Sequence, residues 1–284
     1  MTRIATIKSQ LAQITTIEDL TQAFEGIASI HISRIRDRVV ASKQFFSELW
    51  PVYSNLRIDP KERLKRANRT LKGRSVVVVI TNESRLGTEV TEQIIAAALT
   101  NLNPETTDVI SVGSRGAQLL RQRGVMPVHS FIFPISDLNI NAGDVIKELY
   151  NYDHIAVFYQ TYETLRTQRV QRIDLISAVQ DLGEDVADTG EAISSRDYIF
   201  EPGITEIADY MESVMMGVAF IQIIMEAKLA GYATRFNAMN RAKRRASDLK
   251  ADYRHDYYRA RRAESDERLK EVIKAAKIMK GHQT

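Results

Sequence analysis

Two loops near the middle of the chain have residue types that could bind phosphate, because each follows an apolar run typical of a buried strand. They are Thr81–Gly87 and Val112–Gly116. The second loop lacks the third glycine of a dinucleotide fingerprint and the Gly-Lys-Ser/Thr ending of a P-loop. In the first, Thr81 or Ser84 capping the next helix explains the polar residues without a ligand. Both loops therefore predict ordinary turns, and we expect no nucleotide or other cofactor.

The remaining chemistry-bearing residue types show no catalytic or metal-binding spacing. The chain has no cysteine and five histidines. The histidines lack the spacing of metal ligands, and no serine lies in a nucleophile elbow. We therefore expect no catalytic residue, no metal site and no enzymatic activity of the chain's own. The histidines are His31, His129, His154, His255 and His282.

Basic residues gather in one stretch near the C-terminus, although the net charge of the 284-residue chain is only +3. A solvated helix face is the ordinary explanation of such a run. Here the charges cluster on one predicted helix while the rest of the chain is near neutral, which favours a surface for an acidic partner. The candidate partner-binding residues are Arg235, Arg241, Lys243, Arg244, Arg245, Arg259, Arg261 and Arg262.

Both ends of the chain have the apolar spacing of long helices. Beyond Ile204, apolar residues recur at steps of three and four as far as Ala260 without a proline, and a helix of about 75 residues would span roughly 110 Å. We expect the N-terminal helix to bury this stripe in an antiparallel coiled coil, with a disturbance at Trp50 before Pro51. The N-terminal stripe is Ile4, Ile7, Leu11, Ile14, Leu20, Phe24, Ile27, Ile35, Val39, Phe46 and Leu49.

The middle of the chain alternates short apolar strands with helical segments, which predicts an inserted Rossmann-like α/β domain whose mostly parallel sheet is covered on both faces. A polar stretch at Gly183–Arg196 predicts a mobile loop. The predicted domains are the N-terminal helix 1–72, the α/β domain 73–200 and the C-terminal helix 201–284. Predicted strands are Val76–Ile80, Val109–Val112, Val128–Phe133 and His154–Tyr159, and predicted helices are Leu86–Leu99, Ala117–Arg123 and Ala142–Tyr150.

Composition indicates a folded, soluble protein. Hydrophobic residues make up 44% and charged residues 26% of the chain. No unbroken apolar run approaches the roughly 20 residues of a membrane span, and the first residues read as an amphipathic helix rather than as a secretion signal. We therefore expect a cytoplasmic protein that reaches a membrane only through partners.

Four stretches in order along the chain match the signatures of one family. Leu20–Ala28 is similar to Ile-Thr-x-Ala-Met-x-x-Val-Ala, and Ser111–Gly116 follows a strand with the turn Val-Gly-x-x-Gly. Arg235–Ala242 is similar to Ala-Arg-Met-x-Ala-Met-x-x-Ala, and Tyr257–Arg262 to Tyr-Asn-x-Ala-Arg-Gln. Together these motifs resemble the gamma subunits of F-type ATP synthases.

The resemblance implies a central-stalk rotor that turns inside a hexamer of alpha and beta subunits and also binds an epsilon-type subunit and the membrane c-ring. The chain would then lie on the cytoplasmic face of the cell membrane, held there by the complex. Arg235 matches the family's arginine before Met-x-Ala-Met, which meets a loop of the hexamer. Acidic loops of beta would face the arginine clusters.

Departures from the family pattern mark a divergent member. Asn82–Thr88 replaces Asp-Arg-Gly-Leu-x-Gly-Gly, and Ala242–Ala246 and Ser265–Arg268 replace two C-terminal motifs. A gamma-like subunit of a specialised ATPase that is not coupled to ion transport is therefore a second reading. A nucleic-acid-binding coiled coil is a third, in which the arginines neutralise phosphates, although Tyr253 and Tyr257 fall on the apolar stripe and not beside them. A nucleotide-binding enzyme built on the middle sheet is a fourth.

Overall fold

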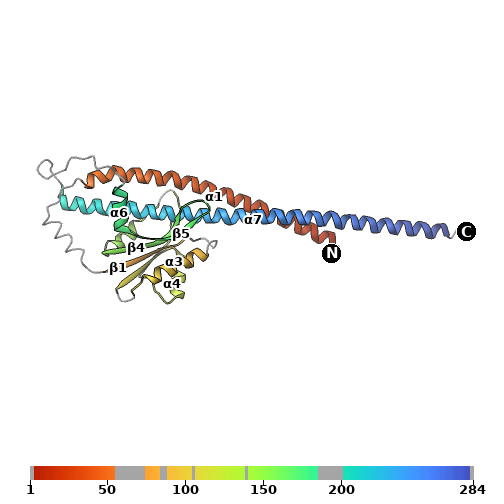
Figure 1. The fold of residues 1–284 in the computed structure, drawn as a ribbon, viewed down its shortest axis with the longest axis horizontal. Helices are drawn as coiled ribbons and strands as arrows, with labels where there is room; N and C mark the ends of the chain where they lie inside the picture. The colour runs from red at the N-terminus through yellow and green to blue at the C-terminus, as the bar shows by residue number, and fades with distance from the viewer. Residues whose placement is uncertain are drawn as a thin grey trace. The chain divides into compact units, whose positions relative to one another are not determined.

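The computed structural model describes residues 3–54, 74–83, 88–103, 106–137, 140–184 and 201–281. Contacts divide the chain into two compact units. Unit 1 consists of Met1–Ile27 and Phe236–Thr284, and unit 2 consists of Ala28–Arg235. Two long helices, α1 (Arg3–Ser54) and α7 (Ile204–Gly281), each contribute to both units (Figure 1). The predicted boundaries at 72 and 200 follow changes in apolar period and stay predictions.

Unit 2 is built on a five-stranded sheet in the order β3-β2-β1-β4-β5. The strands β1 to β4 are parallel, and β5 runs antiparallel to β4 at one edge. The apolar run of β1 is buried on both faces, as expected for a central parallel strand. The bounds are β1 Ser75–Ile80, β2 Thr107–Val112, β3 His129–Phe131, β4 His154–Tyr162 and β5 Gln168–Asp174.

Helices cover both faces of this sheet. Val77 and Val79 of β1 pack with α3 (Thr88–Thr100) and α4 (Ser114–Gln122) in one core. Val76, Val78 and Ile80 point to the other face, where α5 (Gly143–Leu149), α6 (Leu175–Glu184) and α7 form a second core. The alternation of side chains along β1 therefore separates two helical layers.

The sequence-based expectations for this domain were incomplete at β5 and α6, neither of which was predicted. β5 is rich in polar residues and was therefore not recognised as a strand. Its exposed residues are Arg169, Gln171 and Arg172. Such charges on an edge strand discourage pairing with other chains.

The first two residues of the predicted loop Gly183–Arg196 belong to α6, and the rest lies outside the described residues. α1 continues through Pro51 to Ser54, so the disturbance predicted at Trp50 does not end the helix.

In unit 2, α7 is buried on two sides. Met225 and Leu229 pack with Ile35 of α1 in one cluster, whereas Met216 and Phe220 pack against the sheet. A window of 18 residues within Glu206–Ala275 reaches a mean hydropathy of 1.5, long and apolar enough for a membrane span, and 67% of it is buried inside the protein. α1 therefore covers one side of the α7 stripe, as expected, and the sheet covers a second side that the sequence analysis did not predict.

In unit 1, α1 and α7 run antiparallel. Glu25 of α1 contacts Lys243 of α7, and Glu18, seven residues nearer the N-terminus of the chain, contacts Lys250, seven residues further along α7. Residue numbers therefore fall along α1 in the direction in which they rise along α7, as in an antiparallel pair. Ile14 and Ala246 are buried along this seam, but Leu20, Phe24 and Ile27 are about half exposed and do not belong to it. The fold class, an antiparallel coiled coil with an inserted α/β domain, is confirmed, and the assignment of these three residues to the stripe is corrected.

Candidate partner-binding surface and the junction network

The outer face of α7 in unit 1 collects most of the predicted basic residues. At about 100° per residue, Arg241, Arg244, Arg245, Arg259 and Arg262 fall within roughly one third of the helix circumference, opposite the buried Ala246. All five are exposed. The structure gives them no ion pair with any described residue. They are therefore available to a partner with negative charge.

Acidic residues interrupt this face. By the same helical spacing, Asp248, Asp252 and Asp256 lie on the side of α7 that carries the arginines, and all three are exposed. The result is two basic bands, residues 241–245 and 259–262, separated by an acidic stretch. At 1.5 Å per residue the centres of the bands lie about 26 Å apart. A partner that matches both bands must present negative charge at that spacing.

Three of the predicted residues lie elsewhere. Lys243 is half-buried, and its Nζ lies 3.2 Å from Glu25 Oε2, so it serves the seam between α1 and α7. Arg235 belongs to unit 2, where its guanidinium lies 5.6 Å from the centre of the Tyr232 ring. Arg261 is exposed, but the helical spacing places it on the same side as Lys243. The sequence run therefore mixes structural and exposed charges.

The seam in unit 1 holds its acids in the ionised form. The hydrogen bond from Asn240, 2.7 Å long, lowers the pKa of Glu25 despite partial burial, and Lys243 adds to this effect. The hydrogen bond from Lys250 lowers the pKa of Glu18 in the same way. Both carboxylates are therefore charged in neutral solution, and the seam here is ionic.

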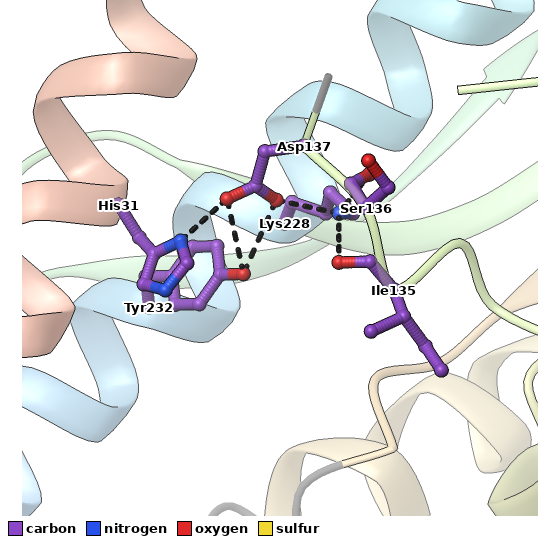
Figure 2. A network of polar contacts seen from close by, with 6 residues as sticks. All are labelled: His31, Ile135, Ser136, Asp137, Lys228 and Tyr232. Carbon is purple, nitrogen blue, oxygen red and sulfur yellow. Dashed lines mark hydrogen bonds and ion pairs between the residues drawn. The ribbon is translucent and has the colours of Figure 1, made fainter. Parts of the chain in front are cut away.

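Unit 2 contains a buried polar cluster, the junction network, made of His31, Asp137, Lys228 and Tyr232 (Figure 2). Lys228 Nζ lies 2.6 Å from Asp137 Oδ1 and donates to the carbonyl of Ser136 at 2.9 Å. The side chains of Lys228 and Asp137 are only 2% and 6% exposed. His31 Nδ1 lies 2.5 Å from Asp137 Oδ2. Since His31 is on α1 and Lys228 on α7, Asp137 joins both helices to the segment after β3.

Electrostatics favour the charged form of Asp137. Burial alone would raise the pKa of its carboxyl group, but hydrogen bonds from Lys228 and His31 outweigh burial and hold the pKa below its usual range. Burial and the nearby Asp137 charge raise the pKa of Tyr232 to about 12, so its hydroxyl keeps its proton and donates to Asp137. The Tyr232 ring also stacks on His31 with centroids 4.6 Å apart. The network is thus an Asp137 to Lys228 ion pair to which the Tyr232 hydroxyl and the His31 ring are also hydrogen-bonded.

Sequence reasoning missed the junction network. One signal was present, because Lys228 is a charged residue inside an apolar stretch of α7, and a lysine is rarely buried unless it is paired. Asp137 lies in an irregular segment far away in sequence, so nothing in the spacing identifies it as the partner.

Of the two loops that resembled phosphate turns, the structure describes Thr81–Glu83 and Val112–Gly116, and these two segments are hydrogen-bonded to each other. Residues 84–87, with the predicted cap Ser84, lie outside the described residues. Thr81 is buried and its Oγ1 accepts the backbone N–H of Gly116 at 3.0 Å, so it caps α4 and not the helix that follows it in sequence. Glu83 accepts the backbone N–H and the hydroxyl of Ser114. A carboxylate therefore occupies the N-terminus of α4, where a phosphate would otherwise be favoured. Gly113, with a φ of 119°, and Gly116 approach Thr81 too closely for a side chain.

Comparisons with known proteins agree along the whole chain. Residues 3–279 match the family model described as ATP synthase. The ATP synthase gamma chain of Mycoplasmoides gallisepticum is 24% identical, over 97% of this chain and 99% of that protein. The ATP synthase gamma chain of Chloroherpeton thalassium is 22% identical, over 98% and 99%. A chain in the structure of Euglena gracilis mitochondrial ATP synthase in rotational state 3 has the same fold, with a TM-score of 0.63, 16% identity and coverage of 99% and 96%.

The chain therefore belongs to the ATP synthase family. Within that family, the curated relatives that match it over nearly their full length are gamma chains.

Proposed function

We propose that this chain is the rotor, or gamma, subunit of the central stalk of an F-type ATP synthase, and that it transmits rotation between the membrane ring and the catalytic alpha/beta hexamer. One observation carries the proposal. The 78-residue helix α7 begins within the α/β domain of unit 2 and continues as half of a coiled coil in unit 1. A single continuous helix with one end fixed in a domain has the construction that a shaft requires.

The outer face of α7 suits contacts that change during rotation. An exposed ion pair contributes only about 0.2 to 1 kcal/mol, so acidic loops of successive beta subunits exchange such contacts without trapping one angle. The coiled coil has no threefold symmetry, so at any angle the three beta subunits meet different surfaces. Differential contact of this kind is what drives sites through different conformations.

The junction network supports the transfer of torque. Breaking a buried ion pair is costly, so Asp137 and Lys228 resist slippage of α7 against the segment that follows β3. His31 extends the same restraint to α1. In this proposal the α/β domain holds the epsilon-type subunit and the membrane c-ring, and the network passes the load on to both helices.

The chain itself supplies no catalysis in this proposal. Glu83 at the N-terminus of α4 repels the phosphate that a nucleotide site would have to bind. The ATP sites belong to the hexamer, and the chain is peripheral on the cytoplasmic face of the cell membrane through its partners.

The proposal is tested by reversing the charge of the two basic bands. The variant carries Arg244→Glu, Arg259→Glu and Arg262→Glu and is reconstituted with its alpha and beta subunits. Glutamate is as good a helix former as arginine, so the helix content measured by circular dichroism stays unchanged. ATPase turnover of the complex is expected to fall about tenfold. The size of this loss should change with salt concentration, because salt screens contacts between subunits, whereas the fold stability of the wild-type chain should not change with salt.

The matched control replaces the same three arginines by lysine, which keeps the charge. We expect turnover within about twofold of the wild type, since an exposed contact depends mainly on charge. Unchanged turnover of the glutamate variant contradicts the proposal. Salt-sensitive DNA binding by the wild-type chain in the same buffer favours the nucleic-acid reading instead.

A further inference from the structure

One edge of the sheet in unit 2 is apolar and exposed. β3 is the last strand in the sheet order, and among the described residues only β2 pairs with it. The segment Gly124–Ser136, which contains β3, has no Asp, Glu, Lys or Arg and is named here the free edge. Its most exposed large apolar side chains are Met126 (74%), Val128 (52%), Ile132 (77%) and Ile135 (85%). A cluster of exposed apolar side chains marks an interaction surface.

The opposite edge of the same sheet is protected against pairing. β5 presents Arg169 and Arg172 to solvent there, and charged side chains on an edge strand discourage a further strand from joining. The free edge has no such charges. The contrast within one sheet indicates that a strand can join at β3 and not at β5.

The free edge is also held in a fixed conformation. The Val128 N–H donates to the carbonyl of Val109 at 2.8 Å, and Lys228 donates to the carbonyls of Ile135 and Ser136. The Ile135 side chain points away from the junction network (Figure 2). A surface that is ordered before binding loses little conformational entropy when a partner arrives.

The residues of β3 are arranged symmetrically about Ser130. If two copies pair antiparallel with one Ser130 opposite the other, Val128 of each copy lies opposite Ile132 of the second copy. On the other face of the strand, His129 lies opposite Phe131 of the second copy, since side chains alternate between faces. Apolar, aromatic and hydroxyl groups thus each meet their own kind, which favours cross-strand pairing. No like charges are brought together, because the free edge carries none.

We propose that the free edge is a self-association site, where a second copy of this chain pairs antiparallel with β3 about a two-fold axis at Ser130. Pairing joins the two sheets into one, whose remaining edges are both protected β5 strands. β3 has only three residues, so the interface is small and its dissociation constant is expected on the order of 10 µM. The inference describes the chain on its own and does not depend on the proposed function.

The first test uses the absence of cysteine from the chain. In the Ser130→Cys variant, the new thiols of two paired copies lie directly opposite each other. Opposed residues of an antiparallel pair have Cα atoms about 4.5 to 5.5 Å apart, which is within the range of a disulfide. The matched control is Ser136→Cys, an exposed position from which two copies point to opposite sides of the axis. With glutathione disulfide as oxidant, we expect Ser130→Cys to cross-link at least about tenfold faster than Ser136→Cys.

The second test measures the mass of the full chain by sedimentation equilibrium at about 0.5 M salt, where ionic contacts between copies are screened. The variant Ile132→Arg introduces a charge opposite Val128 of the second copy. The control is Val40→Arg, because Val40 is 67% exposed on α1 of the same unit and arginine is a good helix former. We expect Ile132→Arg to weaken the dimer at least about tenfold, and Val40→Arg to change it by less than about twofold.

The inference is overturned if the wild-type chain stays monomeric well above the expected dissociation constant, or if the two cysteine variants cross-link at the same rate. A dimer that Ile132→Arg leaves as tight as the wild type assigns self-association to another surface and also overturns it. These measurements use the isolated chain. Their failure therefore leaves the rotor function standing, and that function fails or stands on charge reversal of the basic bands.

Discussion

The helices α1 and α7 are held together by different chemistry in the two units. In unit 2, Ile35 is buried against Met225 and Leu229, and the nearby ion pair of Asp137 and Lys228 is 6% and 2% exposed. In unit 1, the Glu25 to Lys243 pair is 16% and 35% exposed. The same two helices therefore pass from an apolar, dry seam into a partly wet, ionic one.

This difference matters because the destabilisation caused by breaking an ion pair depends on how deeply the pair is buried. A buried ion that loses its partner cannot recover hydration, whereas an exposed ion regains water at little cost. Unit 2 is accordingly the place where a single substitution can destabilise the protein. Unit 1 tolerates changes in its charges, which suits a segment whose neighbours change as it works.

The largest expected effect is in the junction network. Replacing Lys228 by methionine keeps the length of the side chain and leaves the Asp137 carboxylate buried without its ammonium partner. We expect a loss of about 3 kcal/mol in the free energy of unfolding, at the low end of the range for a broken buried pair because His31 and Tyr232 still bind Asp137. Urea unfolding followed by the fluorescence of Trp50 measures the loss.

A double variant, Lys228→Met with Asp137→Leu, is the control, since it removes both charges together. We expect it to be more stable than the single variant. If Lys228→Met alone unfolds at the urea concentration of the wild type, the junction network does not hold unit 2 in the way described.

A smaller effect is expected from acid. The pKa of Asp137 is lowered by Lys228 and His31 in the folded state, so the carboxylate contributes stability above its unfolded pKa of about 3.9, and this contribution is lost as the pH falls through the folded value. The free energy of unfolding of the wild type should therefore fall more steeply below pH 4 than that of the double variant. Parallel curves for the two proteins between pH 2 and 5 would contradict this assignment.

The smallest effect is expected in unit 1. Lys243→Met removes the partner of Glu25, which stays hydrogen-bonded to Asn240 and reaches solvent. We expect a loss below about 1 kcal/mol in the free energy of unfolding, and a smaller one at 0.5 M salt. The comparison between the units fails if this variant is as unstable as Lys228→Met in the same urea titration.

Much of this architecture was predictable from residue periodicity. Val76–Ile80 is a short run of β-branched residues, which favours a buried strand, and α7 has no proline or slip to end it. β5 was missed because an edge strand has one exposed side, where Arg169 and Gln171 read as loop residues. Local pattern therefore identifies the central strands of the sheet but not its edge strand β5.

The candidate site was less predictable, since it depends on which face of a helix each residue takes. The run Arg235–Arg262 indicated a basic surface, but only the pairing of α1 with α7 separates Lys243, which binds Glu25, from Arg244, which faces outward. Leu20, Phe24 and Ile27 have the spacing of a seam and nevertheless lie outside it. Spacing defines a stripe, and only long-range contacts define what covers the stripe.

The unequal lengths of the paired helices have a consequence for the lifetime of an unassembled chain. The register of Glu18 with Lys250 places Arg3, where α1 begins, level with about Ser265, and from Ser265 to Ala275 every residue of α7 is exposed. A single helix of that length is marginal in water. When this end frays, its backbone becomes accessible beside the apolar side chains of Leu269 and Val272, which are already 61% and 65% exposed. Proteases cleave such frayed ends first. Chains that have not assembled should therefore be cleaved at this end and degraded, while chains whose ends are enclosed by partners persist.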